Sequence, residues 1–130
     1  MAYYNKDINA LFIHIPKCYG TFLKNNLISM GFKRCCVSNI TSYHTGTLNY
    51  IANNTNIIDD NTLIIAFMRE PISRIISGCN YCSLNINKIC EPNKLSLHQY
   101  WHIYMPQMKH LEFKNHNIFD RKHLFIGNCN

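Results

Sequence analysis

The sequence predicts an α/β fold, a three-layer sandwich in which a small, mainly parallel sheet is flanked by helices. Two apolar runs, residues 10–15 and 63–68, have the length and composition of buried strands. Each run is followed within a few residues by a segment in which apolar residues recur with helical spacing. Strands that alternate with helices in this way form parallel sheets with both faces covered.

Length and composition indicate one folded domain, residues 1–130. The chain is 47% hydrophobic and 15% charged, which is typical of a folded protein and not of a disordered one. Its net charge of +6 favours an anionic partner, and a nucleotide, an anionic glycan and nucleic acid all fit that charge. We find no internal repeat and no linker long enough to divide the chain.

In the first half, we expect residues 1–9 to be a frayed, polar lead and residues 10–15 to be the first strand. A helix is expected over residues 21–30, and Gly31 ends it. A short strand at 33–37 and a short helix at 47–52 follow, with polar segments on either side. The apolar side chains of the first helix that we expect to face the core are Phe22, Leu23, Leu27 and Met30.

In the second half, residues 63–68 are predicted to form a strand and Pro71 to start the next helix, where its missing N–H is tolerated. Residues 80–94 are expected to be a loop or broken helix, and 96–113 to be mostly helical with a break at Pro106. The last expected strand is 123–126. The side chains of the Pro71 helix that we expect to point inward are Ile72, Ile75, Ile76 and Cys79.

The turn after the first strand has the composition of a phosphate-binding loop. A buried strand stops at a proline, the turn contains Lys17 and Gly20, and a helix begins near Thr21. The first N–H groups of a helix have no partner within it, and its dipole favours an anion there. Gly20 permits close approach of a phosphate, and the Thr21 hydroxyl can cap the helix or bind that phosphate.

A second stretch, after the strand at 63–68, contains Arg69-Glu70-Pro71, Arg74 and Ser77. Together the two stretches resemble the sulfotransferases that use 3′-phosphoadenosine 5′-phosphosulfate (PAPS), most closely the carbohydrate enzymes of the heparan sulfate 2-O type. The resemblance extends over about residues 11–111. It implies a P-loop-like sandwich and transfer of a sulfuryl group from PAPS to a hydroxyl, expected on a carbohydrate, with adenosine 3′,5′-bisphosphate as product.

The resemblance also implies the roles of individual residues. Lys17 contacts the transferring group and stabilises the departing nucleotide, Arg69 and Ser77 hold the 3′-phosphate, and His44 is the catalytic base. No metal is required. The loop residues expected to bind the cofactor are Lys17, Cys18, Tyr19, Gly20, Thr21 and Phe22.

The loop departs from the family pattern at Cys18, Tyr19 and Phe22, where the relatives carry a threonine, a small residue and a serine. Two hydroxyls are missing, and at about 0.5–3 kcal/mol for each hydrogen bond the affinity falls by about one to three decades. Cys18, at a helix N-terminus beside Lys17, is expected to have some thiolate character, which keeps a redox role open.

Each candidate also has a structural interpretation. Lys17 can be an ordinary loop lysine, Arg69 can pair with Glu70, and Arg74 is expected on the helix surface with or without a nucleotide contact. His14, inside the first strand, is expected to be buried and hydrogen-bonded. The segment 101–108 resembles an acceptor-side region of the same relatives, although aromatic residues at this density more often form core.

Three other classes of protein stay open or are disfavoured. The altered loop suits a catalytically silent nucleotide-binding module. A zinc or redox protein is weakly suggested by cysteines at 35, 36, 79, 82 and 90. A nucleoside triphosphatase is disfavoured because the G-x-x-x-x-G-K-[ST] order is absent.

The sequence gives three further expectations about surroundings. No stretch approaches the roughly 20 apolar residues that span a bilayer, and the first ten residues lack the layout of a signal peptide, so we expect a cytoplasmic protein with no membrane span. Seven cysteines, an odd number, favour reduced thiols. Nucleic acid is not the expected partner, because both motifs favour a small nucleotide.

Overall fold

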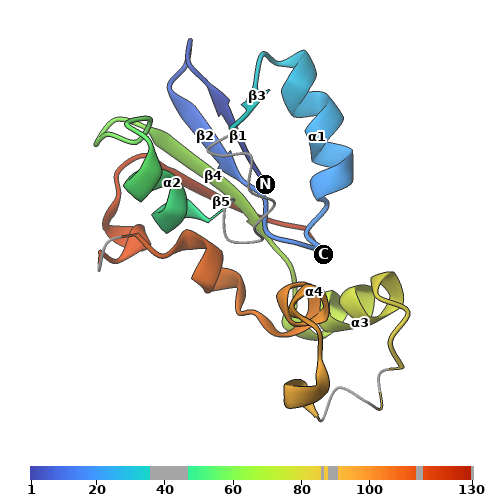
Figure 1. The fold of residues 1–130 in the computed structure, drawn as a ribbon. Helices are drawn as coiled ribbons and strands as arrows, with labels where there is room; N and C mark the ends of the chain where they lie inside the picture. Colours follow the sequence, from blue (N-terminus) through green and yellow to red (C-terminus); the bar gives the residue numbers. More distant parts are fainter. Residues whose placement is uncertain (36–46, 86, 88–90, 114–115, 130) are drawn as a thin grey trace.

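The structure is a computed structural model that describes residues 1–35, 47–85, 87, 91–113 and 116–129. It is an α/β protein with a mixed five-stranded sheet in the order β3-β1-β2-β4-β5 (Figure 1). Strands β2, β4 and β5 are parallel, and β1 is antiparallel to both of its neighbours. The strands are β1 (Ala2–Asn5), β2 (Ala10–Ile13), β3 (Lys33–Arg34), β4 (Leu63–Met68) and β5 (Leu124–Asn128).

Helices lie on both faces of the sheet and beyond its end. Figure 1 shows α1 on one side of the sheet, α2 on the other, and α3 with α4 beyond the end of β4. The α-helices are α1 (Gly20–Ser29), α2 (Leu48–Asn54), α3 (Pro71–Tyr81) and α4 (Leu97–Gln99). Short 3₁₀ or π turns are η3 (Pro92–Lys94), η4 (Tyr100–Tyr104), η5 (Gln107–Leu111) and η6 (Ile118–Asp120). No helix in these described segments is long and apolar enough to cross a bilayer.

The core has two parts because successive strand residues point to opposite faces of the sheet. Leu11 and Ile13 of β2 pack with the buried side chains of α2 and η5. Phe12, between them in sequence, faces the other way and packs with Leu27 of α1 and Phe32. The predicted strands at 10–15 and 63–68 are therefore confirmed as the centre of the sheet, although β2 ends at Ile13.

The expectation that residues 1–9 are frayed is wrong. Ala2 pairs with Ile13, Tyr3 pairs with Phe12, and β1 also pairs with β3. Ala2 and Tyr3 are 2% and 3% exposed. The strand was not predicted because Ala2 is small and Tyr3 and Tyr4 carry hydroxyls, which gives no clear apolar run. A tight turn that includes Asn9 at φ 49 returns the chain into β2.

Two expected helix faces are wrong in part, and Cys79 of α3 is buried as expected. Ile72 and Ile76 of α3 are 67% and 43% exposed, because α3 packs on η4 through Arg74, Gly78 and Cys79 and not on the sheet. On α1, Leu27 is buried as expected. Phe22 and Met30 are 68% and 65% exposed, because this short helix covers the sheet with a narrow stripe.

The remaining elements follow the expectations closely. Gly31 at φ 89 ends α1, and the helix predicted at 47–52 is α2, which Thr47 caps. The segment 96–113 is a series of short turns interrupted at Pro106. The last strand is confirmed as β5, and the strand expected at 33–37 is described only over Lys33–Arg34.

Candidate functional site

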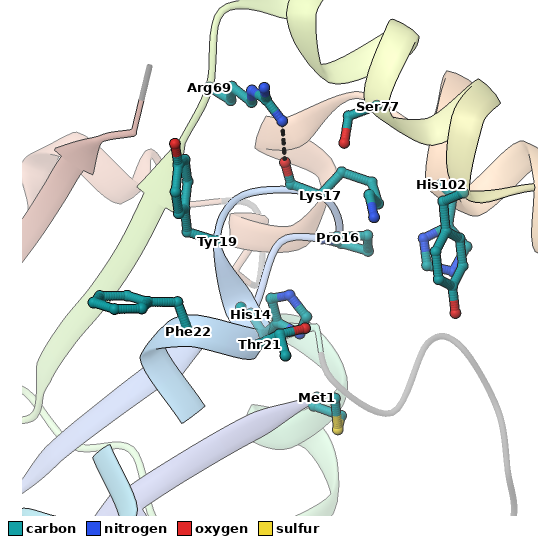
Figure 2. Close-up of a pocket in the computed structure, with 12 residues that line it drawn as sticks. Met1, His14, Pro16, Lys17, Tyr19, Thr21, Phe22, Arg69, Ser77 and His102 are labelled. Atoms are coloured by element: carbon teal, nitrogen blue, oxygen red, sulfur yellow. Dashed lines mark hydrogen bonds between the residues drawn. The ribbon is translucent and has the colours of Figure 1, made fainter. Parts of the chain in front are cut away.

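A cavity of about 470 Å³ opens at the carboxyl ends of β2 and β4, the edge where open α/β sheets bind ligands (Figure 2). The loop after β2 forms one wall, and α3 with η4 forms the opposite wall. The lining residues are Met1, His14, Pro16, Lys17, Tyr19, Gly20, Thr21, Phe22, Arg69, Ser77, Tyr81 and His102. A second hollow of about 550 Å³ shares Lys17, Arg69, Ser77 and Tyr81 and continues along α3.

The loop between β2 and α1 has an unusual backbone. Lys17 and Tyr19 are in the left-handed region at φ 64 and φ 56, which costs about 1 kcal/mol or more for each non-glycine residue. Tyr19 is the N-cap of α1 and gives no side-chain hydrogen bond, so the expectation that Thr21 caps this helix is wrong. Thr21 lines the cavity one residue inside the helix instead.

The uncapped start of α1 contrasts with the other α-helices in the described part of the chain. Thr47, Glu70 and Ser96 each accept hydrogen bonds from the first N–H groups of α2, α3 and α4. The N–H groups at the start of α1 have no such acceptor, and Gly20 and Thr21 lie at the cavity wall. The cavity therefore has backbone donors available to an anion.

The two predicted cations meet in the cavity. The Arg69 guanidinium donates through Nη1 to the carbonyl oxygen of Lys17 at 3.4 Å (Figure 2). The Lys17 ammonium lies 4.2 Å from the centroid of the Tyr81 ring. Arg69 Nε is buried and has no hydrogen-bond partner among the described residues. Ser77 lines the same cavity from α3, so the structure brings together the residues that the two motifs predicted.

None of the described residues that line the cavity is acidic. The carboxylate of Glu70, next to Arg69, accepts from Ile72 N–H at 2.9 Å and from Ser73 N–H at 2.8 Å. These backbone hydrogen bonds hold the pKa of Glu70 below its usual range. In the described part of the chain, ion pairs within 4 Å join Lys94 to Glu91 and Lys109 to Glu112, all away from the cavity. No ion pair within 4 Å joins Arg69 to Glu70 among the described residues, although the nearby Arg69 charge also lowers the pKa of this carboxyl.

Arg74 is buried, and its expected place on the helix surface is wrong. It is 3% exposed because η4 covers this face of α3. The guanidinium donates to three carbonyl oxygens, those of Pro16 at 3.0 Å, Met105 at 2.9 Å and Trp101 at 3.4 Å. Burial lowers the pKa of Arg74, yet an arginine stays charged in proteins. A positive charge therefore lies directly beneath the loop that carries Lys17.

Cys18 does not take part in the cavity as expected. Its side chain is 1% exposed, and its Sγ donates to Gln107 Oε1 at 3.4 Å. Burial raises the pKa of this thiol to about 12, so the expected thiolate character is wrong. The other five predicted loop residues, Lys17 and 19–22, do line the cavity.

Two histidines that sequence reasoning gave little weight line the cavity, His14 and His102. Burial lowers the pKa of each to about 4, so both are neutral at pH 7. Gly20 is required beside His14, since a Cβ at position 20 would overlap the His14 ring. The predicted base, His44, lies outside the described residues.

The segment 101–108 contributes both to the core and to the cavity wall, whereas its expected role on the acceptor side stays a prediction. Trp101 and Ile103 are 5% and 2% exposed and form core, whereas His102 between them faces the cavity. The ring centroid of His102 lies 4.8 Å from that of Tyr81, and its buried Nδ1 has no hydrogen-bond partner among the described residues. The aromatic and histidine residues of this segment were the sequence signal for this wall of the cavity. Their spacing did not show which side chains face the cavity and which face the core.

The described cysteines do not gather into a group that could hold a metal ion. In the described part of the chain, no group of three or more His, Cys, Asp or Glu side chains could hold a metal ion. Burial raises the pKa of Cys79 and of Cys82. Cys36 and Cys90 lie outside the described residues.

No protein-family profile, curated protein or solved structure matches the chain. What is known of the candidate site therefore comes from its own residues. It offers two flexible cations, uncapped backbone N–H groups, a hydroxyl on α3 and neutral imidazoles within one cavity. This set of groups can bind a polyanion and can move a proton to or from a neutral ligand.

Proposed function

We propose that the chain is a PAPS-dependent sulfotransferase with a P-loop-like three-layer fold. One observation carries this proposal: Lys17, Arg69 and Ser77, which are up to 60 residues apart in sequence, line one cavity with no described carboxylate. Arg69 Nε is buried and has no partner in the described part of the chain, and the start of α1 has no side-chain cap. Both features fit a ligand with anionic groups at two ends.

The residues divide between the two ends of the nucleotide. We assign Lys17 and the first N–H groups of α1 to the 5′-phosphosulfate, and Arg69 with Ser77 to the 3′-phosphate. The cavity of about 470 Å³ and the adjoining hollow of about 550 Å³ are in the size range of cofactor sites. The hollow along α3 continues from Ser77, which leaves room for the nucleoside on the 3′-phosphate side.

Bound PAPS would supply an activated sulfuryl group that passes to the acceptor hydroxyl, which we propose to be on a carbohydrate. The chain's own residues position the two reactants and neutralise charge, as in phosphoryl transfer. The Lys17 ammonium stabilises negative charge on the departing 5′-phosphate, and Arg74 adds a buried positive charge beneath the loop. We assign removal of the proton of the acceptor hydroxyl to His44. Among the described residues, the neutral imidazoles of His14 and His102 line the cavity.

Calorimetry tests the binding step. Adenosine 3′,5′-bisphosphate is titrated into the parent chain, Lys17→Ala and Arg69→Ala, with ATP as the competing nucleotide. Loss of a charge-assisted contact of about 1.5–3 kcal/mol predicts affinity about 10- to 150-fold weaker in each variant. Lys24→Ala, an exposed position on α1 outside the cavity, is the matched control and should bind as the parent does. Parent-like affinity in both test variants would show that the site assignment is wrong.

A second candidate function, a nucleotide-binding module without turnover, is favoured by the altered loop. Cys18 is turned away from the cavity, and Phe22 presents an exposed ring where relatives carry a hydroxyl. Incubation of the chain with PAPS and a mixture of glycan acceptors separates the two functions. Tight binding of adenosine 3′,5′-bisphosphate without release of that product from PAPS would favour the silent module.

A further inference from the structure

The side chain of Gln107 holds the backbone of Arg69 at two points. Its Oε1 accepts from Arg69 N–H at 2.8 Å, and its Nε2 donates to Arg69 C=O at 2.7 Å. A residue of a neighbouring β-strand would make the same two hydrogen bonds with its backbone. Here the side-chain amide of Gln107, from η5, makes them just past the end of β4. The same Oε1 also accepts from the Cys18 thiol at 3.4 Å. One glutamine therefore contacts both the loop after β2 and the residue that follows β4.

The Arg69 side chain has few restraints of its own. Its Nη1 hydrogen bond to Lys17 is 3.4 Å long, and its guanidinium lies 6.0 Å from the Tyr19 ring. Its Nε is buried without a partner in the described chain. Gln107 holds the backbone position from which the Arg69 side chain extends into the cavity, and few other contacts restrain that side chain.

The segment that carries Gln107 is itself anchored to the loop. Arg74 donates to the carbonyl oxygens of Trp101 and Met105 and, through Nε, to that of Pro16. The turn from Trp101 to Gln107 thus connects the loop beneath Lys17 with the residue that follows β4. A rigid connection between two parts of a binding site keeps their separation matched to one ligand.

We propose that Gln107 is a positioning residue that aims Arg69 at the 3′-phosphate and so sets selectivity for a 3′,5′-bisphosphate over a 5′-monophosphate. This inference rests on the proposed function and adds a determinant of ligand specificity to it. Gln107 makes two short hydrogen bonds to the Arg69 backbone, at 2.8 and 2.7 Å, and a single longer one to the Cys18 thiol at 3.4 Å, so we expect its loss to affect the 3′-phosphate end of the site more than the 5′ end.

The test compares two ligands on matched glutamine variants. Calorimetry measures the affinities for adenosine 3′,5′-bisphosphate and adenosine 5′-monophosphate in the parent chain, Gln107→Met and Gln107→Glu. The control is Gln99→Met, since Gln99 is the other glutamine of the chain and its Oε1 likewise accepts a backbone N–H, that of Ser96 at 3.0 Å. Gln107→Glu keeps the acceptor for Arg69 N–H and so provides a second variant if Gln107→Met does not fold.

We expect the bisphosphate affinity to fall about tenfold in Gln107→Met and the monophosphate affinity to change less than about threefold. In Gln107→Glu the loss for the bisphosphate is larger, because a carboxylate beside Arg69 competes with the phosphate. Gln99→Met keeps the parent's ratio of the two affinities. Equal weakening for both ligands, or an unchanged ratio in both Gln107 variants, would overturn this inference alone. A parent chain that binds neither ligand would instead overturn the proposed function and the inference with it.

Discussion

Gly78 lies inside α3 where that helix meets η4, and its replacement by alanine tests this contact. A Cβ at position 78 would lie 2.5 Å from the carbonyl oxygen of His102 and 3.1 Å from Ile103 Cγ1. The nearest atom belongs to the backbone, so it cannot rotate away as a side chain could. Carbon and carbonyl oxygen approach to about 3.3 Å at closest, so α3 and η4 must separate by about 0.8 Å.

Two effects of opposite sign decide the stability of Gly78→Ala. Alanine in a helix interior is favoured over glycine by about 1 kcal/mol. Overpacking a buried contact costs about 1–3 kcal/mol, and a backbone neighbour places this site at the upper end. The difference predicts a loss of about 2 kcal/mol in the free energy of unfolding, which corresponds to a melting temperature roughly 6 °C lower.

Urea unfolding followed by tryptophan fluorescence measures this loss. Trp101 is the only tryptophan in the chain, is 5% exposed, and packs edge-on against His110 at 4.7 Å between ring centroids. The control is Asn80→Ala, an exposed position on the same helix, which should change the free energy by no more than about 0.5 kcal/mol. If Gly78→Ala is as stable as the parent or more stable, the close packing of α3 on η4 is wrong.

Two further predictions concern titratable groups. His14 and His102 have a pKa of about 4 in the folded chain and of 6.5 in the unfolded chain. Between pH 6.5 and 4 the unfolded chain therefore binds more protons than the folded one, so the free energy of unfolding falls as the pH drops through this range. The urea midpoint of the parent chain should decrease from pH 6.5 to pH 5, and this decrease should be smaller in the double variant His14→Gln with His102→Gln. An equally steep decrease in both proteins would contradict the prediction. Cys18, buried with a pKa of about 12, should react with iodoacetamide at pH 8 on the order of 100-fold more slowly than Cys82, as peptide mass spectrometry can measure. Comparable rates at the two cysteines would show that Cys18 is accessible.

The parts of the fold that could be predicted from the sequence are those with a local signal. Residues 63–68 form an uninterrupted apolar run, and β4 has the predicted bounds. The start of α3 at Pro71 follows from the fixed φ of proline. Strand β1 was missed because its burial comes from pairing with β2 and β3, and four residues with two tyrosines and an asparagine carry no clear periodicity.

The sequence predicted the site residues that follow strands. It did not predict the residues whose place depends on contacts between elements far apart in the sequence. Lys17 lies in the loop after β2 and Arg69 directly follows β4, and because these strands are parallel neighbours, the meeting of the two residues at one edge follows from the topology. The burial of Arg74 depends on η4, which lies some 30 residues further along, and no local pattern shows it. The same holds for Gln107, whose amide reaches Arg69 across 38 positions of sequence.

The positive potential of the cavity depends on where the acidic side chains lie, and net charge alone does not establish it. Asp59 and Asp60 precede β4 and Arg69 follows it, so they lie at opposite ends of that strand. Six residues at about 3.3 Å each separate them by roughly 20 Å. The Debye length is about 8 Å at physiological ionic strength, so these exposed carboxylates are screened from Arg69. Arg74 is screened much less because it is buried beside the loop. The sheet therefore separates the anion-binding groups from these aspartates. Glu70, the carboxylate next to Arg69, does not line the cavity and accepts from the first N–H groups of α3.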